Sequence, residues 1–511
     1  MNNYIMEKYP AYTFLKEGNA VPLIRGLRVI DMEGAFKRQR GLGESPGFVE
    51  FFGRKTRKFP TGLMNLALKS IKEFNPDSEV EIIDCIDNAK PLQHVDADIL
   101  EGVTLRPYQI DSVNKCLDTH RGVFYVGTGG GKTLILLAMI AELLSKGYTS
   151  LIMVPTTAIL MKTANQIEKY LDVKPGICGG KYRTVRDVTV ITNQSLDAAV
   201  RPDSYEIDSP MGRAVTENNR DTELLNFINN VDALFIDEVH TSTAPAWYRA
   251  AMSSNAWFRV GFTGTLDEES EIRMMRLMAT TGSILIRKPA HELIEEGYLA
   301  VPYIHAILDE SLYGGYEMPN FVLCRDATEF YRKLYTAAIV ENDAYNGHVA
   351  DLVKELSDRG KAVLVVCQMR QHFRVLQNLL ENRDVQFWSC WGDTPLAARV
   401  EAMNELERTG QGVILATKIF DVGVDIPALD AIVLTAGGKA SISTRQRAGR
   451  GLRAKIGKEN VVRIFDFMNN SVKKLAQHSL ARWEIYENEQ FEVVPEDNFQ
   501  GLLKKIRNGE I

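Results

Sequence analysis

The sequence predicts an α/β fold with two lobes, each a parallel sheet flanked by helices, preceded by a small α+β domain at the N-terminus. Three observations support this prediction. Short apolar runs alternate with helix-length segments over residues 101–300, and the alternation returns from about residue 345. A glycine-rich turn links a strand to a helix in the first of these regions. The 511 residues also exceed the roughly 250–300 residues at which single cores stop growing, so several domains are expected.

Composition is that of an ordinary globular protein. Hydrophobic residues make up 45% and charged residues 25% of the chain, which leaves enough apolar surface for sizeable cores. The six cysteines include no C-x-x-C pair, so neither a zinc site nor a disulfide framework is indicated. No apolar run approaches the ~20 residues of a membrane span, and the N-terminus lacks the apolar segment of a signal peptide. We therefore expect a cytoplasmic protein with no membrane partner.

Residues 1–98 are expected to form the small N-terminal domain. Short β-like runs at Leu27–Ile30 and Phe48–Phe52 alternate with glycine turns, and Glu79–Ile83 is interpreted as a last strand before a polar linker. Between them we expect an amphipathic helix. Its apolar face comprises Leu63, Leu66, Ala67, Ile71 and Phe74.

Positive charge gathers in this domain, although the whole chain has a formal net charge of −6. The basic residues are Lys37, Arg38, Arg40, Arg54, Lys55, Arg57 and Lys58. We expect the last four to bind DNA phosphates, so that removing their charge weakens DNA binding and lowers its salt dependence. The plainer alternative is a solvated basic face.

The first lobe is expected over residues 99–305 and the second over residues 346–511, with a connecting segment at 306–345. Four apolar strands are expected in the first lobe, at Leu151–Val154, Val188–Ile191, Ala233–Ile236 and Val260–Phe262. Four more are expected in the second, at Ala362–Val366, Gly412–Leu415, Ala431–Leu434 and Val461–Phe465. The polar stretch 197–230 is interpreted as an inserted surface loop that ends in a helix, and the chain is expected to end in a helical tail.

The glycine-rich turn Gly127–Thr133 lies between the apolar strand Val123–Val126 and a helix from Leu134. Such a turn can wrap its backbone N–H groups around an anion at a helix N-terminus. The cradle would comprise Gly127, Thr128, Gly129, Gly130 and Gly131. Lys132 would reach the outer phosphates of a nucleotide, and Thr133 would offer its hydroxyl to Mg²⁺. Val126 stands where the general phosphate-loop pattern starts with glycine, and a turn without a ligand is the plainer alternative.

Two further groups point to the same nucleotide. Gln109 opens a helix upstream of the turn, and its amide can complement an adenine edge, although a capping role for its own helix is the plainer interpretation. The strand Ala233–Ile236 runs into Asp237 and Glu238, at the edge where α/β folds bind ligands. Asp237 would hold Mg²⁺ through water, and Glu238 would polarise the water that attacks the γ-phosphate. His240 would sense that phosphate.

Five motifs then follow one another in a characteristic order. They are Gly127–Thr133, Asp237–His240, Thr263–Thr265, Asp421–Pro427 and Gln446–Arg453. This ordered set, which spans residues 105–467, resembles the superfamily 2 helicases and translocases. The resemblance implies two tandem RecA-like lobes and an ATPase that uses ATP and Mg²⁺.

The resemblance also implies roles for residues outside the glycine turn. Arg450 and Arg453 would complete the catalytic site from the second lobe, which makes hydrolysis depend on lobe closure. Asp425 and Gln446 would bind the nucleotide, while Thr263 and Thr265, with His240, would link it to a nucleic-acid track. On that track we expect Pro155, Thr156, Thr192 and Gln194 in the first lobe and Gln368, Arg399 and Thr417 in the second. The aromatic group Phe387, Trp388 and Trp391 is expected to pack in the second core rather than to stack on bases.

Within the superfamily, Asp-Glu-Val-His at 237–240 and the segments 105–109, 154–157 and 291–299 resemble DNA translocases, and above all the phage UvsW-type recombination helicases. That likeness implies unwinding and branch migration of forked or four-way DNA with 3′-to-5′ movement, in the cytoplasm of a phage host. It also implies a monomer whose partners are branched DNA with a single-stranded track and a single-strand-binding or recombination protein. Two alternatives stay open, a restriction-type translocating subunit and a nucleotide-switched clamp that does not unwind.

Overall fold

The computed structural model describes residues 3–31, 47–86, 90–200, 222–266, 270–308, 319–417, 429–435, 460–469 and 473–510. The chain divides into two compact units. The first comprises Met1–Val126 and Gly131–Arg287, and the second comprises Gly127–Gly130 and Lys288–Ile511. Among the described residues, no helix is long and apolar enough to cross a membrane.

The N-terminal domain is built on a four-stranded sheet in the order β5-β2-β1-β6. Its strands are β1 (Asn3–Lys8), β2 (Tyr12–Glu17), β5 (Lys58–Pro60) and β6 (Glu79–Asp84), and a separate pair is formed by β3 (Arg28–Ile30) and β4 (Phe48–Glu50). The described part of the domain also contains the helices α1 (Val21–Gly26) and α3 (Met64–Phe74). Helix α3 follows the short turn η1 (Thr61–Leu63). The apolar face predicted for α3 is buried at Leu63, Ala67 and Ile71. Phe74, also assigned to that face, is 45% exposed, because the helix ends there beyond the core.

This domain packs on helix α10 (Glu271–Thr280) of the first lobe. Met275 and Ala279 of α10 belong to the same buried cluster as Leu63 and Ala67. Gly62 lies so close to α10 that a Cβ there would meet the Met278 carbonyl oxygen at 2.0 Å, so only glycine fits. The two parts therefore share one apolar core.

The first lobe contains an eight-stranded sheet in the order β10-β9-β11-β8-β12-β13-β7-β14. Its strands are β7 (Arg121–Val126), β8 (Ser150–Val154), β9 (Gly176–Gly179), β10 (Tyr182–Thr184), β11 (Val188–Thr192), β12 (Ala233–Ile236), β13 (Phe258–Thr263) and β14 (Ile284–Lys288). From β9 to β7 each neighbouring pair is parallel. The four strands expected over residues 151–262 are present, and the apolar strand expected before the glycine turn lies in β7.

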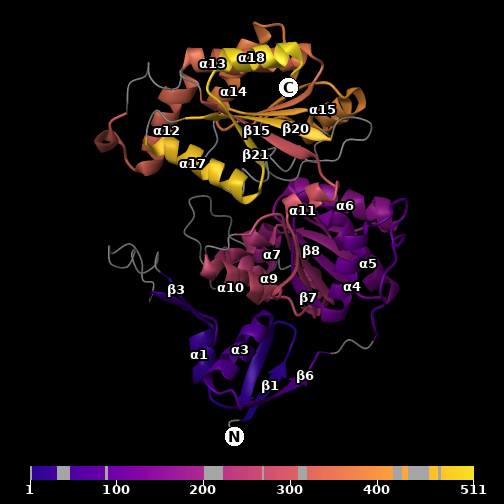
Figure 1. The fold of residues 1–511 in the computed structure, drawn as a ribbon. Helices are drawn as coiled ribbons and strands as arrows, with labels where there is room; N and C mark the ends of the chain where they lie inside the picture. Colours follow the sequence, from indigo (N-terminus) through magenta and orange to yellow (C-terminus); the bar gives the residue numbers. More distant parts are fainter. Residues whose placement is uncertain are drawn as a thin grey trace. The chain divides into compact units, whose positions relative to one another are not determined.

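Helices cover both faces of this sheet (Figure 1). On one side lie α4 (Pro107–Thr119), α5 (Lys132–Ser145) and α6 (Thr157–Leu171), and on the other lie α7 (Asn193–Val200), α9 (Pro245–Met252) and α10. Alternate strand residues such as Leu151, Met153 and Leu234 join the cluster formed with α7 and α9. The polar stretch predicted as a loop ends in α8 (Thr222–Asn230), as expected.

The second lobe contains a seven-stranded sheet in the order β17-β18-β16-β19-β20-β15-β21, parallel throughout. Its strands are β15 (Val301–Leu308), β16 (Ala362–Cys367), β17 (Phe387–Cys390), β18 (Gly412–Thr417), β19 (Ala431–Leu434), β20 (Val461–Met468) and β21 (Glu492–Glu496). Its helical elements are α11 (Ala290–Glu295), α12 (Ala327–Tyr335), the π-turn η6 (Thr336–Val340), α13 (Asp343–Asp358), α14 (Arg370–Glu381), α15 (Leu396–Thr409), α17 (Lys473–Asn488) and α18 (Phe499–Asn508). The predicted fold class, with two parallel sheets flanked by helices behind a small α+β domain, is confirmed.

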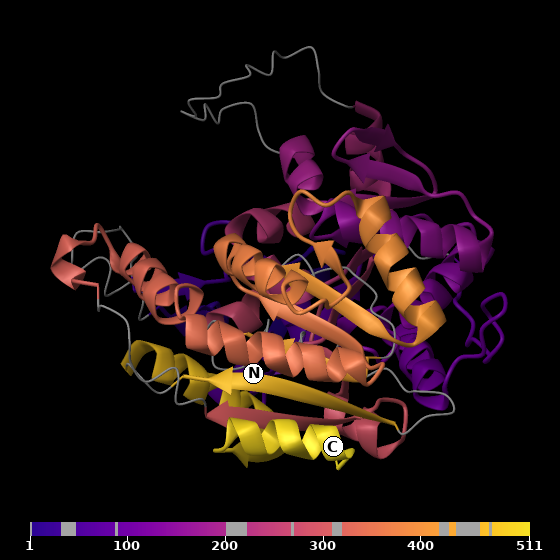
Figure 2. The ribbon, with the colours of Figure 1, turned by 90° about the horizontal axis from the view of Figure 1, so that it is seen from above.

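The lobe boundaries differ from those expected. Strand β15 pairs along its whole length with β20, about 160 residues later in the chain, so it belongs to the second sheet and not to the first lobe. Figure 2 shows β15 beside these C-terminal strands. The segment expected to be only a connection also contains α12 and η6, whose Leu334, Tyr335 and Ile339 lie in the second core. The expected helical tail includes strand β21, which pairs with β15. Local patterns identify a strand but do not reveal so distant a partner.

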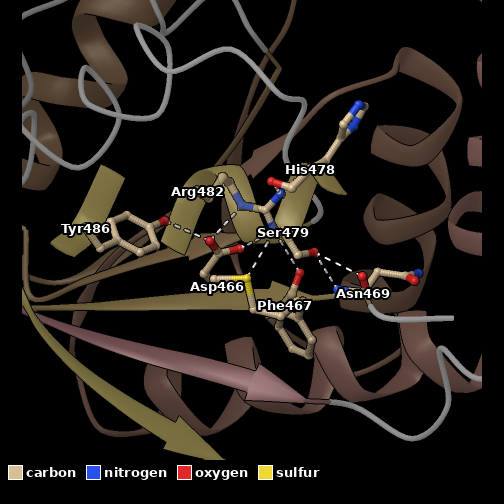
Figure 3. Close-up of polar contacts among 8 residues, drawn as sticks. Asp466, Phe467, Asn469, His478, Ser479, Arg482 and Tyr486 are labelled. Atoms are coloured by element: carbon tan, nitrogen blue, oxygen red, sulfur yellow. Dashed lines mark hydrogen bonds and ion pairs between the residues drawn. The ribbon is translucent and has the colours of Figure 1, made fainter. Parts of the chain in front are cut away.

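A buried ion pair ties the end of β20 to helix α17 (Figure 3). The Arg482 guanidinium donates to both carboxylate oxygens of Asp466, at 2.8 and 3.0 Å, and the Tyr486 hydroxyl donates to Oδ2 at 2.7 Å. Burial alone would lower the pKa of Arg482, but the Asp466 carboxylate raises it above its usual value. Arg482 also donates to the carbonyl of Phe467, so its charge is compensated on several sides.

We expect Asp466→Ala to destabilise the second lobe by about 3–5 kcal/mol, because it leaves a buried guanidinium without its counter-ion. Urea denaturation followed by far-ultraviolet circular dichroism measures the change. Glu405→Ala is the matched control, since it breaks an exposed pair with Arg408 and should leave the denaturation midpoint unchanged. Equal midpoints for the two variants would contradict a stabilising role for the buried pair.

Candidate nucleotide and nucleic-acid site

The parallel strands of the first sheet bring the predicted motifs to one edge. Ile236 lies opposite both Met153 and Gly261, so the ends of β12, β8 and β13 coincide. Val154 lies opposite Thr192. Segments that follow these strands are therefore neighbours in the order of the sheet. From one side to the other they begin at Thr192, Pro155, Asp237, Thr263 and, after β7, the glycine turn.

The glycine turn has the backbone of a phosphate cradle. Gly129 and Gly131 adopt left-handed φ angles of +85° and +81°. A Cβ at Gly131 would lie 2.2 Å from the amide nitrogen of Gln109, so a larger residue there would have to displace the Gln109 side chain. The Gly130 N–H donates to the Gly127 carbonyl at 3.0 Å, which closes the turn. These residues fit an anion bound by backbone N–H groups.

Val126 fits this turn although the general pattern has glycine in its place. The side chain is fully buried in the core of the sheet, and the residue does not adopt a left-handed φ angle. The Val126 carbonyl accepts a hydrogen bond from the Lys132 ammonium at 3.1 Å. Only the backbone of this position faces the turn, so valine is compatible with the cradle.

Gln109 combines its two predicted roles in one position. Its Oε1 accepts a hydrogen bond from the Arg106 N–H at 2.9 Å, which caps helix α4. Its amide nitrogen faces Gly131, and the side chain is 1% exposed. The capping interpretation is therefore observed, and recognition of adenine stays a prediction.

The two carboxylates after β12 differ in their surroundings. Burial, reinforced by the nearby Glu238 charge, raises the pKa of Asp237 to about 6, while Lys132 and Lys162 act in the opposite direction. Asp237 Oδ1 accepts the Glu238 N–H at 3.0 Å. Oε2 of Glu238 is buried and accepts no hydrogen bond within the described part of the chain. Lys162, on helix α6, was not predicted, because its position two turns beyond Thr156 does not distinguish it from a solvated lysine.

His240 connects this acidic pair to the next strand. Its Nδ1 lies 2.9 Å from Thr263 Oγ1 and 3.4 Å from Glu238 Oε2. The Thr263 hydroxyl donates to the Thr265 carbonyl at 2.6 Å, so its oxygen must accept from His240. Burial lowers the pKa of His240 to about 4. At neutral pH the ring is therefore uncharged, with its proton on Nδ1, and Nε2 is an acceptor.

The residues of this edge fit Mg²⁺ and ATP by their chemistry. A glycine cradle lies beside the Lys132 ammonium. Asp237 has a raised pKa that a divalent cation would relieve, and Glu238 has a buried oxygen that accepts no hydrogen bond from the described residues. Thr133 is the second residue of helix α5, directly after Lys132, and is partly exposed.

The residues expected on the nucleic-acid track of the first lobe lie farther along the same edge. Thr156 caps helix α6 by accepting from the Ile159 N–H, and the Thr192 hydroxyl donates to Ser195 Oγ at 3.0 Å. Both hydroxyls thus make local hydrogen bonds. Gln194 is exposed and Pro155 partly exposed. Gln194 and the backbone groups of this edge are consequently the better placed to contact a ligand.

In the second lobe, Gln368 and Thr417 lie at the ends of neighbouring strands, because Cys367 is opposite Thr417. Arg399 donates to the carbonyls of Trp391 and Gly392, at 3.3 and 3.1 Å. Trp391 packs against the second core, as does Phe387, which agrees with the packing interpretation. Four residues expected at the nucleotide, Asp425, Gln446, Arg450 and Arg453, lie outside the described residues, as do Lys37, Arg38 and Arg40.

The basic group of the N-terminal domain is less uniform than expected. Arg54 makes two hydrogen bonds to the Glu50 carboxylate, at 2.8 and 2.9 Å. Arg57 donates to the carbonyls of Leu15 and Gly18, both at 2.9 Å, so it holds the chain in place. Lys58 lies 4.1 Å above the ring of Tyr12. Lys55 is exposed and makes no hydrogen bond or ion pair to any described residue.

Comparison with known proteins gives two family matches within the chain. Residues 102–268 match the family model of the type III restriction enzyme, res subunit, and residues 347–455 match the helicase conserved C-terminal domain. The DNA 3′-5′ translocase XPB2 of Sulfurisphaera tokodaii is 24% identical over 413 residues, which are 76% of this chain and 86% of that protein.

Two solved structures are also similar. The helicase MrfA bound to DNA and AMPPNP aligns over 78% of this chain and 52% of that one, with 14% identity and a TM-score of 0.54. The crystal structure of T4 UvsW aligns over 97% of this chain and 99% of that one, with 18% identity and a TM-score of 0.42. The MrfA likeness shows that the tandem parallel-sheet fold is shared.

The raised pKa of Asp237 predicts that its ionised carboxylate lowers the stability of the nucleotide-free protein. Its ionised form is disfavoured in the fold, so Asp237→Asn should stabilise the nucleotide-free protein at pH 8 by about 1–3 kcal/mol. This gain should shrink as the pH falls from 6 toward 4, where the wild-type carboxyl takes up its proton. Chemical denaturation at pH 8 and pH 5 measures the difference. A variant less stable than the wild type at pH 8 would contradict the assigned cause.

Proposed function

This chain belongs to superfamily 2 of the helicases, and we propose that it is an ATP-driven motor that moves along DNA and unwinds branched DNA. The single observation that supports this most strongly is the common edge of the first sheet. There the phosphate turn, the acidic pair and the expected nucleic-acid positions follow one another on neighbouring strands. A hydrogen-bonded relay through His240 and Thr263 joins two of these segments.

ATP would be held by the backbone of Gly127–Gly131 and by the Lys132 ammonium, and Mg²⁺ by Thr133 and, through water, by Asp237. The bound nucleotide supplies the phosphoanhydride whose hydrolysis drives movement. Glu238 would orient and polarise the attacking water through the oxygen that accepts no hydrogen bond from the described residues. Neutral His240 can accept a hydrogen bond at Nε2 and relay the state of the site to Thr263.

Arg450 and Arg453 would complete this site from the second lobe, since a planar guanidinium matches the charge that develops on the transferring phosphoryl group. Asp425 and Gln446 would contact the same nucleotide. Hydrolysis then requires both lobes, which makes each turnover a cycle of closing and opening.

Branched DNA as the substrate is supported by the likeness of the motifs to UvsW-type helicases and by the N-terminal domain. That domain is fixed to the first lobe by a shared core and by Arg121, which donates to carbonyls of both parts. A rigid extra domain gives the motor a second DNA contact, which a simple single-strand translocase does not need. The named activity of XPB2 supports 3′-to-5′ movement.

A restriction-type translocating subunit is the second candidate. The first-lobe match to the res subunit of type III restriction enzymes favours it. Such a motor would translocate on duplex DNA without separating the strands, and it would depend on partner subunits for cleavage.

The substrate proposal is tested by measuring ATP hydrolysis and strand displacement on single-stranded, duplex, forked and four-way DNA, with an RNA control. We expect the highest turnover on forked and four-way DNA, accompanied by displacement. Turnover on duplex DNA without displacement would favour the restriction-type motor. Slow hydrolysis with tight binding and no displacement would favour a clamp.

Lys132→Ala, Glu238→Gln and Arg450→Ala are expected to lower DNA-stimulated ATP hydrolysis by about 10²-fold or more, because each removes a group that we propose to act on the phosphates or the attacking water. Circular dichroism serves to show that each variant is folded. Stimulated turnover near the wild-type rate in any of them would refute the role assigned to that residue.

A further inference from the structure

An open pocket of about 410 Å³ lies where the N-terminal domain meets the first lobe. Its walls include Tyr12, Phe51 and Lys58 from the N-terminal domain and Tyr248, Arg249 and Arg276 from helices α9 and α10. A volume of this size is within the range of small-molecule sites, roughly 300–1,000 Å³. None of these six residues belongs to the helicase motifs.

The lining has two kinds of group. Tyr12 and Tyr248 are partly exposed aromatic rings near the largely buried Phe51, and the lining also contains three cationic side chains. The carboxylate in the lining, Glu50, is already paired through both oxygens with Arg54. Arg249 is paired in the same way with Asp197, so the positive charge of the lining is that of Lys58 and Arg276. Rings beside cations suit a planar base that carries a phosphate, which is the chemistry of an unpaired nucleotide.

The walls of the pocket are held by contacts that do not depend on a ligand. The rings of Phe51 and Tyr248 meet edge to face at 6.5 Å, across the boundary between the two parts. Below them the buried Arg259 donates to the carbonyls of Ala251, Ser254 and Thr280, which fixes α9 against the start of β13 and the end of α10. Fixed walls lower the entropy cost of binding.

The pocket is also connected to the nucleic-acid edge. Arg249 donates to Asp197 Oδ1 through both Nε, at 3.1 Å, and Nη2, at 2.8 Å. Asp197 lies on helix α7, which begins at Asn193, directly after Thr192 at the end of β11. Helix α7 thus begins beside the expected nucleic-acid track. One turn later its Asp197 binds Arg249, which lines the pocket.

We propose that this pocket binds an unpaired nucleotide of a DNA strand, with its base against Tyr12 and Tyr248 and its phosphate near Lys58 and Arg276. The inference rests on the proposed DNA motor function and adds a site to it. The pocket would hold a displaced single strand on the N-terminal domain while the lobes act on the remaining DNA. Of the four basic residues expected to bind DNA phosphates in this domain, only Lys58 lines the pocket.

Photocrosslinking of the full-length protein to a thymidine oligonucleotide containing 5-iododeoxyuridine tests the site, because this base crosslinks to aromatic side chains. Mass spectrometry should find crosslinks at Tyr12, Phe51 or Tyr248. Crosslinks confined to other residues would overturn the proposal. DNA-stimulated ATP hydrolysis measured on the same sample separates the two ideas, since stimulation without these crosslinks removes the pocket and leaves the motor intact.

Matched pairs of variants give a second test, read by fluorescence anisotropy on a labelled single strand. Lys58→Ala should weaken binding about five- to tenfold, whereas Lys55→Ala, with the same change of charge, should change it less than twofold. Tyr12→Ala should weaken binding about tenfold, Tyr9→Ala should not, and Tyr12→Phe should restore it. If the two variants of either pair weakened binding equally, the domain would bind DNA by non-specific electrostatic attraction, and the pocket proposal would be wrong.

Free thymidine monophosphate distinguishes the two sources of a nucleotide. At millimolar concentration it should not prevent the crosslinks, because a strand gains affinity from its other contacts. Loss of the crosslinks together with unchanged strand binding in Tyr12→Ala would assign the pocket to a free nucleotide and overturn the assignment to a strand.

Discussion

The structure depends on one geometric constraint, which is that neighbouring parallel strands end together at one edge of their sheet. Five segments of the first lobe that are far apart in the chain meet there because Ile236 is held opposite Met153 and Gly261, and Val154 opposite Thr192. A shift of one strand by one residue would turn the following side chains to the other face. The buried apolar strands prevent such a shift, so the packing of the core fixes the position of Asp237 relative to Lys132 and Thr263.

Buried arginines outside the candidate site are held by hydrogen bonds or by a counter-ion, although burial still lowers the pKa of Arg259 to about 10. Arg259 donates to three carbonyls, and Arg482 pairs with Asp466. Asp237 instead has a raised pKa, and Glu238 Oε2 is buried and accepts no hydrogen bond from a described residue. A divalent cation bound beside Asp237 would offset the cost of burying its carboxylate.

Much of the fold could be predicted, because the spacing of apolar residues and the positions of turn residues are local features of the sequence. The nine strands predicted for the lobes are all present. Strands β1 and β2 were not predicted, since polar residues interrupt their pattern. The boundary expected at residue 305 falls inside β15, which was not predicted and whose partner lies 160 residues away. The partners of charged side chains could not be predicted from the sequence either. Arg54 and Arg57 look like free cations until Glu50 and the carbonyls of Leu15 and Gly18 are placed beside them. The residues that line the pocket between the N-terminal domain and the first lobe come from four separate segments of the chain, so no local motif predicts the pocket.

We infer that nucleotide and DNA are coupled through the hydrogen bonds of His240 and Thr263. Strand displacement per ATP hydrolysed by Thr263→Val tests it directly, because valine keeps the shape and removes only the hydroxyl. Thr280→Val is the control, since its hydroxyl is also buried but donates to Leu277 away from the edge. We expect Thr263→Val still to hydrolyse ATP while its displacement per ATP falls at least tenfold, with the control unchanged. An unaltered ratio in Thr263→Val would contradict coupling through this strand.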